Sequence, residues 1–427
     1  MSSGPGDSRL HVLVVGGGGR EHALAWACAR SPLVGRVTCA PGNAGTLRVG
    51  ENRQVAATDA AGIVALAISE RADLAVLGPD AAVAAGVGDA LELAGVRCFG
   101  PSREAGRLES SKSFAKRLMQ RAAIPTPAFV VFDDPESAAR HLRQRTGPVV
   151  VKADGLAMGK GAFVCAGPEE ALTVVDRLLR GHELGPAGER VVIEDCLFGE
   201  EASFFAICDG DTAVMLPPAR DYKRAFDGDL GPNTGGMGSF APSPVAGWPV
   251  LNQLVRRQVV EPALAEMRRL GCPYRGCLYV GAMLVGEGIQ VLEFNARFGD
   301  PETEVQLPLL PDLVPLFWQS AEGRLQLPDP QPLGGACVGV VAAREPYPAP
   351  VEVGGELAGM DAAEELGCLV FQMGTRLSAQ RLAEVSGGRV LICTAVGADP
   401  QEARRLAYLG LARISFPGMR YRQDIAA

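Results

Sequence analysis

A short acidic segment, VLEFNARFGDPETE, carries the residues whose types and spacing most directly suggest chemistry. It begins as an apolar run typical of a strand, in which Glu293 and Asn295 stand two residues apart. Side chains at i and i+2 point to the same face of a strand, so a carboxylate and an amide oxygen face one point. Such hard ligands suit Mg²⁺, which proteins usually hold with one or two side chains plus substrate phosphates. Arg297 falls on the same side; the alternative is a charged strand end without a ligand.

A glycine-rich segment, VVVKADGLAMGKGAFV, places a lysine on either side of a turn. It lacks the P-loop pattern, because Gly155 to Gly159 is one residue short and Gly161 replaces the required Ser or Thr. We interpret it as a strand with Lys152, a turn with Lys160 and a return strand. Such a flap would bring two cations onto a triphosphate. A plain hairpin is the alternative, although an unpartnered lysine in an apolar strand would be costly.

Two further segments offer polar groups to a nucleotide or a small substrate. In VVIEDCLFGEEASF a strand ends at Glu194, and Glu201 follows seven residues later. The chain between them could meet an adenine edge and Glu201 the ribose hydroxyls; a solvated acidic turn is the alternative. In DYKRAFDGDLGPNTGGMGSFAP, basic residues precede a loop whose glycines permit close approach of the backbone to an anion. A surface loop without a ligand is the alternative.

The N-terminal VVGGGGREHALA follows a short apolar strand and opens a helix. A dinucleotide fingerprint needs a third glycine for helix–strand packing, but the chain has Glu21 or His22 there, depending on the starting glycine. The second strand ends at Ala40-Pro41 without an acidic residue for a ribose. The loop still places backbone N–H groups at a helix N-terminus, which suits a phosphate monoester. A tight turn without a ligand is the alternative.

Alternating strand and helix patterns position these segments. They predict a small parallel α/β sheet, with strands at 12–15, 37–40, 74–77 and 96–99 and helices at 21–29, 60–68 and 81–93. Further along, the patterns predict a loop at 227–238 and a long helix at 249–270. Turn and proline signals predict an N-terminal domain at 10–102, a central domain at 103–328 with a unit inserted at 123–190, and a C-terminal α+β domain at 329–427.

Composition limits the partners and the location. The 427 residues are 47% hydrophobic and 21% charged, and the net charge of −8 argues against nucleic acid as the main partner. No apolar run reaches the roughly 18 residues of a membrane span, and residues 1–9 lack a signal-peptide pattern. The 11 cysteines are scattered without a CxxC pair. We expect a cytoplasmic protein with small-molecule partners, no nucleic acid and no membrane contact, acting as a monomer, with a weak dimer as the alternative.

Together these segments closely resemble the phosphoribosylamine–glycine ligases of the ATP-grasp superfamily. The resemblance runs from about Val12 to Ile425, on the motifs GGGGREHALAW, APGNAGT, GPDA, FGPS, LESSKSFAK, KADGLAMGKG, GPNTGGMG and EFNARFGDPETE. It implies a pre-ATP-grasp parallel α/β domain, an ATP-grasp core with an inserted lid, and a small C-terminal α+β domain. It also implies the second step of de novo purine synthesis. ATP would phosphorylate glycine, and the amine of 5-phospho-β-D-ribosylamine would attack the glycyl phosphate to give glycinamide ribonucleotide, ADP and phosphate.

The resemblance implies a role for each matching residue. The metal, Mg²⁺ with Mn²⁺ as the alternative ion, would bind to Glu293 and Asn295. ATP would bind to Lys112, Lys152, Glu194, Leu197 and Glu201. Catalysis would fall to Arg297, Lys152 and Asp221. Glycine and phosphoribosylamine would contact Gly18, Gly19, Arg20, Glu21, Asn43, Asp80, Asn233, Thr234, Gly235, Gly236 and Asp300.

Two residues depart from the family pattern, and other functions compete. Gly17 stands where the family often has Asn, and Tyr222 where His is usual. Another ATP-grasp carboxylate–amine ligase would keep EFN and KADG but should lack GGGGREHALAW and APGNAGT. A dinucleotide-dependent oxidoreductase is disfavoured by the missing third glycine and the missing acidic residue. A non-catalytic ATP-binding regulator is disfavoured by the intact set of candidate catalytic and metal residues.

Overall fold

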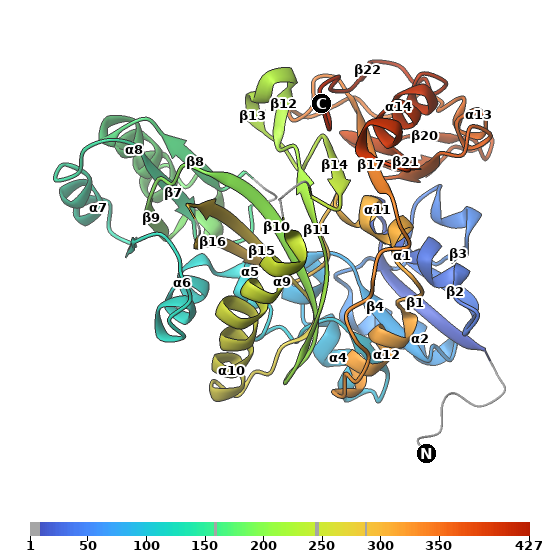
Figure 1. The fold of residues 1–427 in the computed structure, drawn as a ribbon, viewed down its shortest axis with the longest axis horizontal. Helices are drawn as coiled ribbons and strands as arrows, with labels where there is room; N and C mark the ends of the chain where they lie inside the picture. The colour runs from blue at the N-terminus through green and yellow to red at the C-terminus, as the bar shows by residue number, and fades with distance from the viewer. Residues whose placement is uncertain (1–8, 158–159, 244–246, 287) are drawn as a thin grey trace.

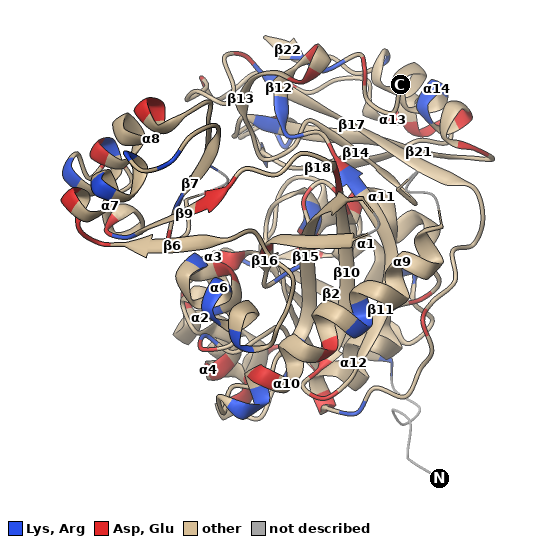
Figure 2. Cartoon of the chain, turned by 60° about the vertical axis from the view of Figure 1, so that its left-hand side comes forward, with Lys and Arg blue, Asp and Glu red and all other residues tan. Residues whose placement is uncertain are grey.

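The computed structural model describes residues 9–157, 160–243, 247–286 and 288–427. Figure 1 shows N-terminal elements in blue, a projecting unit in teal on the left, a long central sheet and C-terminal elements in red at the top. Within the described residues we find no helix with the length and hydropathy that crossing a bilayer requires. Positions of Lys or Arg and positions of Asp or Glu are interspersed along outer helices such as α7 Pro135–Leu142 and α10 Glu261–Arg269 (Figure 2).

The N-terminal part is a five-stranded sheet in the order β3-β2-β1-β4-β5, with every adjacent pair parallel. This confirms the predicted parallel α/β sheet. Its strands are β1 Leu10–Gly16, β2 Val34–Pro41, β3 Glu51–Asn52, β4 Leu74–Leu77 and β5 Arg97–Phe99, and its helices α1 Gly19–Arg30, η1 Thr46–Arg48, α2 Ala60–Ser69, α3 Asp80–Ala84 and α4 Val87–Leu93. The single helix expected at 81–93 is wrong. Gly86, with φ 78°, separates α3 from α4, because a left-handed residue interrupts the helix.

The projecting unit is a four-stranded antiparallel sheet in the order β6-β9-β7-β8, with two helices packed on it. Its strands are β6 Phe129–Phe132, β7 Val149–Ala153, β8 Ala162–Cys165 and β9 Val191–Asp195. The helices are α7 Pro135–Leu142 and α8 Pro168–Val175, with short turns η2 Asp176–Arg180 and η3 Gly185–Gly188. The unit has a hydrophobic core of its own, so it packs as a compact body.

One long sheet joins the centre of the molecule to its C-terminal part. Its order is β16-β15-β10-β11-β14-β17-β21-β18, with β22 beside β17. The strands are β10 Glu200–Asp209, β11 Ala213–Asp221, β14 Gly238–Ala241, β15 Arg275–Val285, β16 Gly288–Asn295, β17 Ala336–Arg344, β18 Leu369–Gln372, β21 Arg389–Gly397 and β22 Met419–Arg420. Because β14 pairs with both β11 and β17, the C-terminal strands extend the central sheet.

The segment expected as a loop at 227–238 is partly ordered. It forms a hairpin, β12 Arg224–Phe226, η4 Asp227–Asp229 and β13 Leu230–Asn233, and a loop follows only from there to β14. Gly228, with φ 68°, makes the turn of this hairpin. The glycines of the segment therefore indicated a hairpin as well as a loop. A second hairpin pairs β19 Thr375–Leu377 with β20 Ala383–Val385.

Helices cover the central sheet and lock it to the N-terminal part. They are α5 Arg107–Ser110, α6 Lys112–Arg121, α9 Trp248–Val255, η5 Arg256–Val260, α10 Glu261–Arg269, α11 Thr303–Gln306, η6 Leu307–Leu309, α12 Val314–Glu322, α13 Met360–Glu364 and α14 Pro400–Leu411. The helix predicted at 249–270 matches the continuous run of α9, η5 and α10. Phe99 of β5 stacks on Phe317 of α12 at 4.4 Å between ring centroids and packs on Phe298. This contact fixes the N-terminal sheet against the acidic segment.

Candidate active site

The two residues of the expected metal pair lie at the end of β16. Asn295 is buried and Glu293 half-buried, and they pair across the sheet with Tyr279 and Gly281 of β15. Gly281 leaves room beside the Glu293 side chain, since a Cβ there would lie 3.3 Å from Cγ of Glu293. Lys112, the first residue of α6, donates from Nζ to Glu293 Oε2 at 2.9 Å.

The charges around Glu293 keep it ionised. Burial alone would raise the pKa of this carboxyl, but Lys112, Lys223 and Lys152 hold the pKa well below its usual range. An ionised carboxylate and the amide oxygen of Asn295 form a hard donor set, and three lysines lie close enough to Glu293 to act on its charge. These residues therefore fit Mg²⁺ bound together with a phosphorylated substrate.

Two buried lysines share one carboxylate oxygen. Nζ of Lys116 and Nζ of Lys152 lie 3.0 and 3.1 Å from Oε2 of Glu194, and Lys116 also donates to Thr126 Oγ1 at 2.7 Å. Burial, followed by repulsion from Lys152, lowers the pKa of Lys116 to about 8. The cluster therefore carries excess positive charge in a dry place, which suits a triphosphate. Sequence reasoning missed Lys116; its i, i+4 spacing from Lys112 on one helix face was the available signal.

Lys152 also connects the projecting unit to the acidic strand. Its Nζ donates to the carbonyl of Leu292 at 2.9 Å. The ladder between β15 and β16 shifts register at this point and leaves Leu292 out of the pairing, so its carbonyl is free to accept. The structure thereby places Lys152 beside the strand that carries Glu293. Residues 158 and 159 of the expected flap turn lie outside the described residues.

The three residues assigned to adenine and ribose are spread over β9, β10 and the loop between them. Glu194 is 1% exposed and faces the lysines, and its Oε1 has no hydrogen-bond partner among the described residues. Leu197 is half-buried. Glu201 is exposed and accepts from Lys223 Nζ at 3.1 Å. The Glu194 carboxylate is thus engaged mainly with lysine charges, leaving Oε1 to accept from a ligand.

Arg297 follows β16 and joins the candidate metal pair to α5. One of its terminal nitrogens, NH2, lies 2.9 Å from Glu109 Oε1 and 3.3 Å from Asn295 Oδ1. The other Glu109 oxygen accepts from the Ala296 N–H at 2.8 Å. Burial would lower the pKa of Arg297, but the charges of Glu109 and Asp80 raise it. A permanently charged guanidinium is therefore fixed beside Asn295. Sequence reasoning missed Glu109, although it lies in the LESSKSFAK motif.

Asp221 ends β11 opposite Ser239 of β14, close to Lys223, whose Nζ is 4.0 Å from Asp221 Oδ1. Burial raises the pKa of Asp221, and Lys223 opposes this shift. Thr234 closes the following loop, because its N–H and hydroxyl both donate to the Lys223 carbonyl, at 2.7 and 2.9 Å. Asn233, which ends β13, is half-buried.

Arg389 of β21 reaches this loop from the C-terminal part, and sequence reasoning missed it. NH1 of its guanidinium donates to the Gly235 carbonyl at 2.5 Å and lies 2.9 Å from Asp300 Oδ1. Gly236, with φ 109°, turns the loop against Pro301. Because its contacts lie about 90 and 150 residues away in the chain, no local pattern identifies Arg389.

The glycine-rich loop is tied to the acidic segment. Glu21 accepts from the Gly18 N–H at 2.6 Å and from Arg20 Nε at 2.6 Å, and Arg20 donates from NH1 to the Phe298 carbonyl at 3.2 Å. Gly19 lies so close to α11 that any side chain there would collide with it. The four residues therefore border the segment that links the metal pair to α11.

Asn43 and Asp80 border the same loop. Asn43 donates from Nδ2 to the Gly17 carbonyl at 3.0 Å and the Gln372 carbonyl at 2.7 Å, which joins the N-terminal loop to the C-terminal part. A side chain at Gly17 would meet the neighbouring backbone, so the usual Asn would need a local shift here. Asp80 opens α3, is half-buried and acts on Arg297 through its charge.

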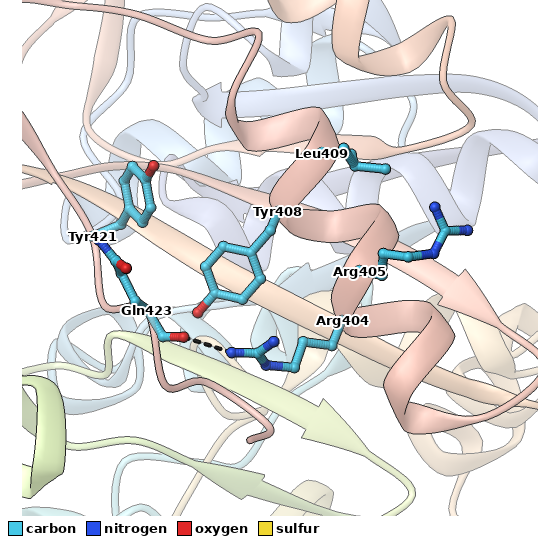
Figure 3. Close-up of a pocket in the computed structure, with 6 residues that line it drawn as sticks. All are labelled: Arg404, Arg405, Tyr408, Leu409, Tyr421 and Gln423. Carbon is cyan, nitrogen blue, oxygen red and sulfur yellow. Dashed lines mark hydrogen bonds between the residues drawn. The ribbon is translucent and has the colours of Figure 1, made fainter.

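A separate surface pocket of about 470 Å³ lies on the C-terminal part (Figure 3). Arg404 donates to the Gln423 and Ile425 carbonyls, at 2.6 and 2.9 Å. The Tyr222 hydroxyl accepts from the Ala426 N–H at 2.9 Å. These groups anchor the C-terminal segment. This anchoring contact also gives a structural role to Tyr222, the residue that stands where His is usual in the family. The pocket is lined by Arg404, Arg405, Tyr408, Leu409, Tyr421 and Gln423.

The fold and this arrangement define an ATP-grasp protein. The family model of the phosphoribosylglycinamide synthetase ATP-grasp (A) domain matches residues 110–303 of the chain. The N and C domains of the same synthetase match residues 10–109 and 337–427. The chain therefore belongs to the phosphoribosylglycinamide synthetase family.

Curated relatives and a solved structure indicate the same family. The chain is 47% identical to a phosphoribosylamine–glycine ligase of Caulobacter vibrioides, covering 98% of each chain, and 46% identical to that of Nostoc sp., covering 97% and 99%. The crystal structure of the Thermotoga maritima phosphoribosylamine–glycine ligase matches with a TM-score of 0.86 at 35% identity, covering 97% of this chain and 100% of that one. A biotin carboxylase domain from Hydrogenobacter thermophilus, solved with MgADP and bicarbonate, shares the fold at 17% identity, with a TM-score of 0.74 over 97% and 92% of the two chains.

Proposed function

We propose that this protein ligates glycine to 5-phospho-β-D-ribosylamine with ATP, through glycyl phosphate, as its family membership indicates. The observation that carries the proposal is the convergence of Lys152 and Lys112 on one short stretch of β16: Lys152 contacts Leu292 and Lys112 contacts Glu293. A triphosphate at this point would meet lysines from the projecting unit and from α6. Asn295 faces the same point.

The residues of this cluster suit a phosphoryl transfer to a carboxylate. Glu293 and Asn295 would hold Mg²⁺, which neutralises phosphate charge when it is bound. Lys112, Lys116 and Lys152 add positive charge. No protein nucleophile is needed, because the phosphate itself becomes the leaving group of the acyl phosphate. Catalysis then depends on positioning and charge stabilisation.

The remaining candidate residues surround the place where the acyl phosphate would meet the amine. Arg297 offers a fixed cation beside the metal pair, and Asp221 with the loop from Asn233 would hold glycine. Arg389 presents its guanidinium, 19% exposed, between that loop and Asp300. Its charge suits the phosphate of phosphoribosylamine. The glycine-rich loop at the N-terminus of α1 would contact the same substrate.

The test is a coupled assay of ADP release with single amino acids, with and without phosphoribosylamine. We expect ADP release that requires glycine, rises with phosphoribosylamine and falls sharply when alanine or aspartate replaces glycine. Equal rates with the other amino acids would favour another ATP-grasp carboxylate–amine ligase. ADP release that no amino acid stimulates would refute ligase activity.

A further inference from the structure

Glu302 is a buried carboxylic acid that none of the roles above uses. It caps α11, and this short helix packs against β11, β14 and β17. Thr303 donates to the Gly299 carbonyl at 2.5 Å and Gln306 to the Pro217 carbonyl at 2.6 Å, so the segment around Glu302 is firmly held. The residue is only 3% exposed, and its carboxylate lies against Gly299, where a Cβ would collide with it.

No other described residue hydrogen-bonds to the Glu302 carboxylate, in contrast to Glu109 and Glu194. Burial, followed by repulsion from Asp221, raises the pKa of Glu302 to about 7, while Arg297 and Lys223 oppose this shift. The charged and titratable groups that act on it come from several elements: Asp221 of β11, Lys223 after it, Tyr279 and Cys277 of β15, Arg297 after β16 and Arg389 of β21. Charges from both the Asp221 side and the Arg297 side of the site therefore act on Glu302.

We propose that Glu302 is the general base of the ligation step, an inference that rests on the proposed function. The amine nitrogen of phosphoribosylamine attacks the carbonyl carbon of glycyl phosphate, so a C–N bond forms and the C–O bond to phosphate breaks. Phosphate leaves with the electron pair of that bond. The proton lost by the nitrogen passes to the Glu302 carboxylate and later to solvent. A buried carboxylate that no other residue engages, bonded only by its own backbone N–H, can take up this proton.

The experiment separates the two half-reactions with Glu302→Gln. Hydroxylamine traps glycyl phosphate as glycine hydroxamate without needing a base, whereas ligation to phosphoribosylamine needs one. We expect the variant to form hydroxamate within about 3-fold of the wild-type rate and to ligate at least about 100-fold more slowly, the range of general-base effects. Wild-type ligation should also fall on the acid side of about pH 7, and the variant should lack that limb. Glu302→Asp should restore part of the ligation rate.

Glu266→Gln provides a control, because Glu266 is a buried carboxylic acid on α10 that pairs with Arg269 and has no role in the site. We expect this control to ligate within about 3-fold of wild type, because a carboxylate that is not the general base should not show the far larger loss that removing a general base causes. The proposal is overturned if Glu302→Gln keeps its ligation rate, if it loses hydroxamate formation to the same extent, or if Glu266→Gln loses ligation equally. A wild-type protein that forms no glycine hydroxamate would instead refute the proposed function, so the two failures are distinguishable.

Discussion

Replacing Lys116 by Met should stabilise the folded protein without ligands and weaken its binding of ATP. Lys116 is 1% exposed, and it shares the Glu194 carboxylate with Lys152. Two buried cations therefore face one anion, which costs free energy when no triphosphate is present. Met has a similar length and no charge, so it fills the space and removes the excess cation.

The pKa of Lys116 gives the magnitude. A fall from 10.5 to about 8 corresponds to about 3 kcal/mol against the charged form in the folded state. Loss of the hydrogen bond to Thr126 offsets about 1 kcal/mol of this stabilisation. The free energy of unfolding of Lys116→Met should therefore exceed that of wild type by about 2 kcal/mol near pH 7. Because the folded pKa lies below the unfolded one, the unfolded chain holds this proton more tightly. Wild-type stability should therefore rise between about pH 8 and pH 10.5, and the advantage of the variant should shrink there.

Urea unfolding at about pH 7 and pH 9.5 measures this difference, and repeating the pH 7 experiment with ATP measures the linked binding. ATP should stabilise the wild type by about 2 kcal/mol more than the variant if its affinity falls about 30-fold. Arg117→Met, an exposed change on the same helix, should alter stability by less than about 0.5 kcal/mol. A variant that is less stable than wild type at pH 7, or a gain that does not depend on pH, would refute the reasoning.

Two further predictions concern the candidate metal pair and Arg389. Glu293→Gln should remove Mn²⁺ binding, measured by electron paramagnetic resonance with ATP present, and should slow ADP formation at least about 100-fold while circular dichroism shows an intact fold; near-normal turnover would reject the metal role. Arg389→Gln should raise the KM for phosphoribosylamine about 10- to 100-fold, with the KM for ATP changed less than about 3-fold, because a charge-assisted contact to phosphate contributes about 1.5–3 kcal/mol. An equal rise in both KM values would contradict that assignment.

Local patterns were sufficient for the strands that carry Lys152 and the candidate metal pair. The i, i+2 spacing in EFN identifies Glu293 and Asn295 as neighbours on one strand face, and the apolar strand before KADG explains why Lys152 must have a partner. Glycine spacing was less reliable. Gly86 lies in an alanine-rich stretch whose helical pattern continues on both sides, and only its positive φ shows that two helices meet there.

Residues held by long-range pairing could not be predicted in this way. Arg389 contacts Gly235 and Asp300 because β14 carries the sheet from β11 to β17 and on to β21, and no periodicity within one segment reveals that order. Whether the Glu194 carboxylate contacts an adenine base or the lysines likewise depends on the tertiary partners of its two oxygens. Sequence spacing specifies a face, whereas pairing across elements decides what that face meets.

The acidic segment changes conformation every few residues, and this order has a chemical consequence. The candidate metal pair lies on a strand, Arg297 and Asp300 lie on the irregular link after it, and Glu302 lies at the start of a short helix. Glu293 pairs with Lys112 of α6, Arg297 with Glu109 of α5, and Asp300 with Arg389 of β21. The helix that Glu302 caps packs against β11. A phosphate near β16 and an amine near Glu302 would therefore be positioned by one stretch of chain. A shift of α11 would disturb proton transfer from the amine before it disturbed ATP binding, because β16 is held independently by its ladder to β15.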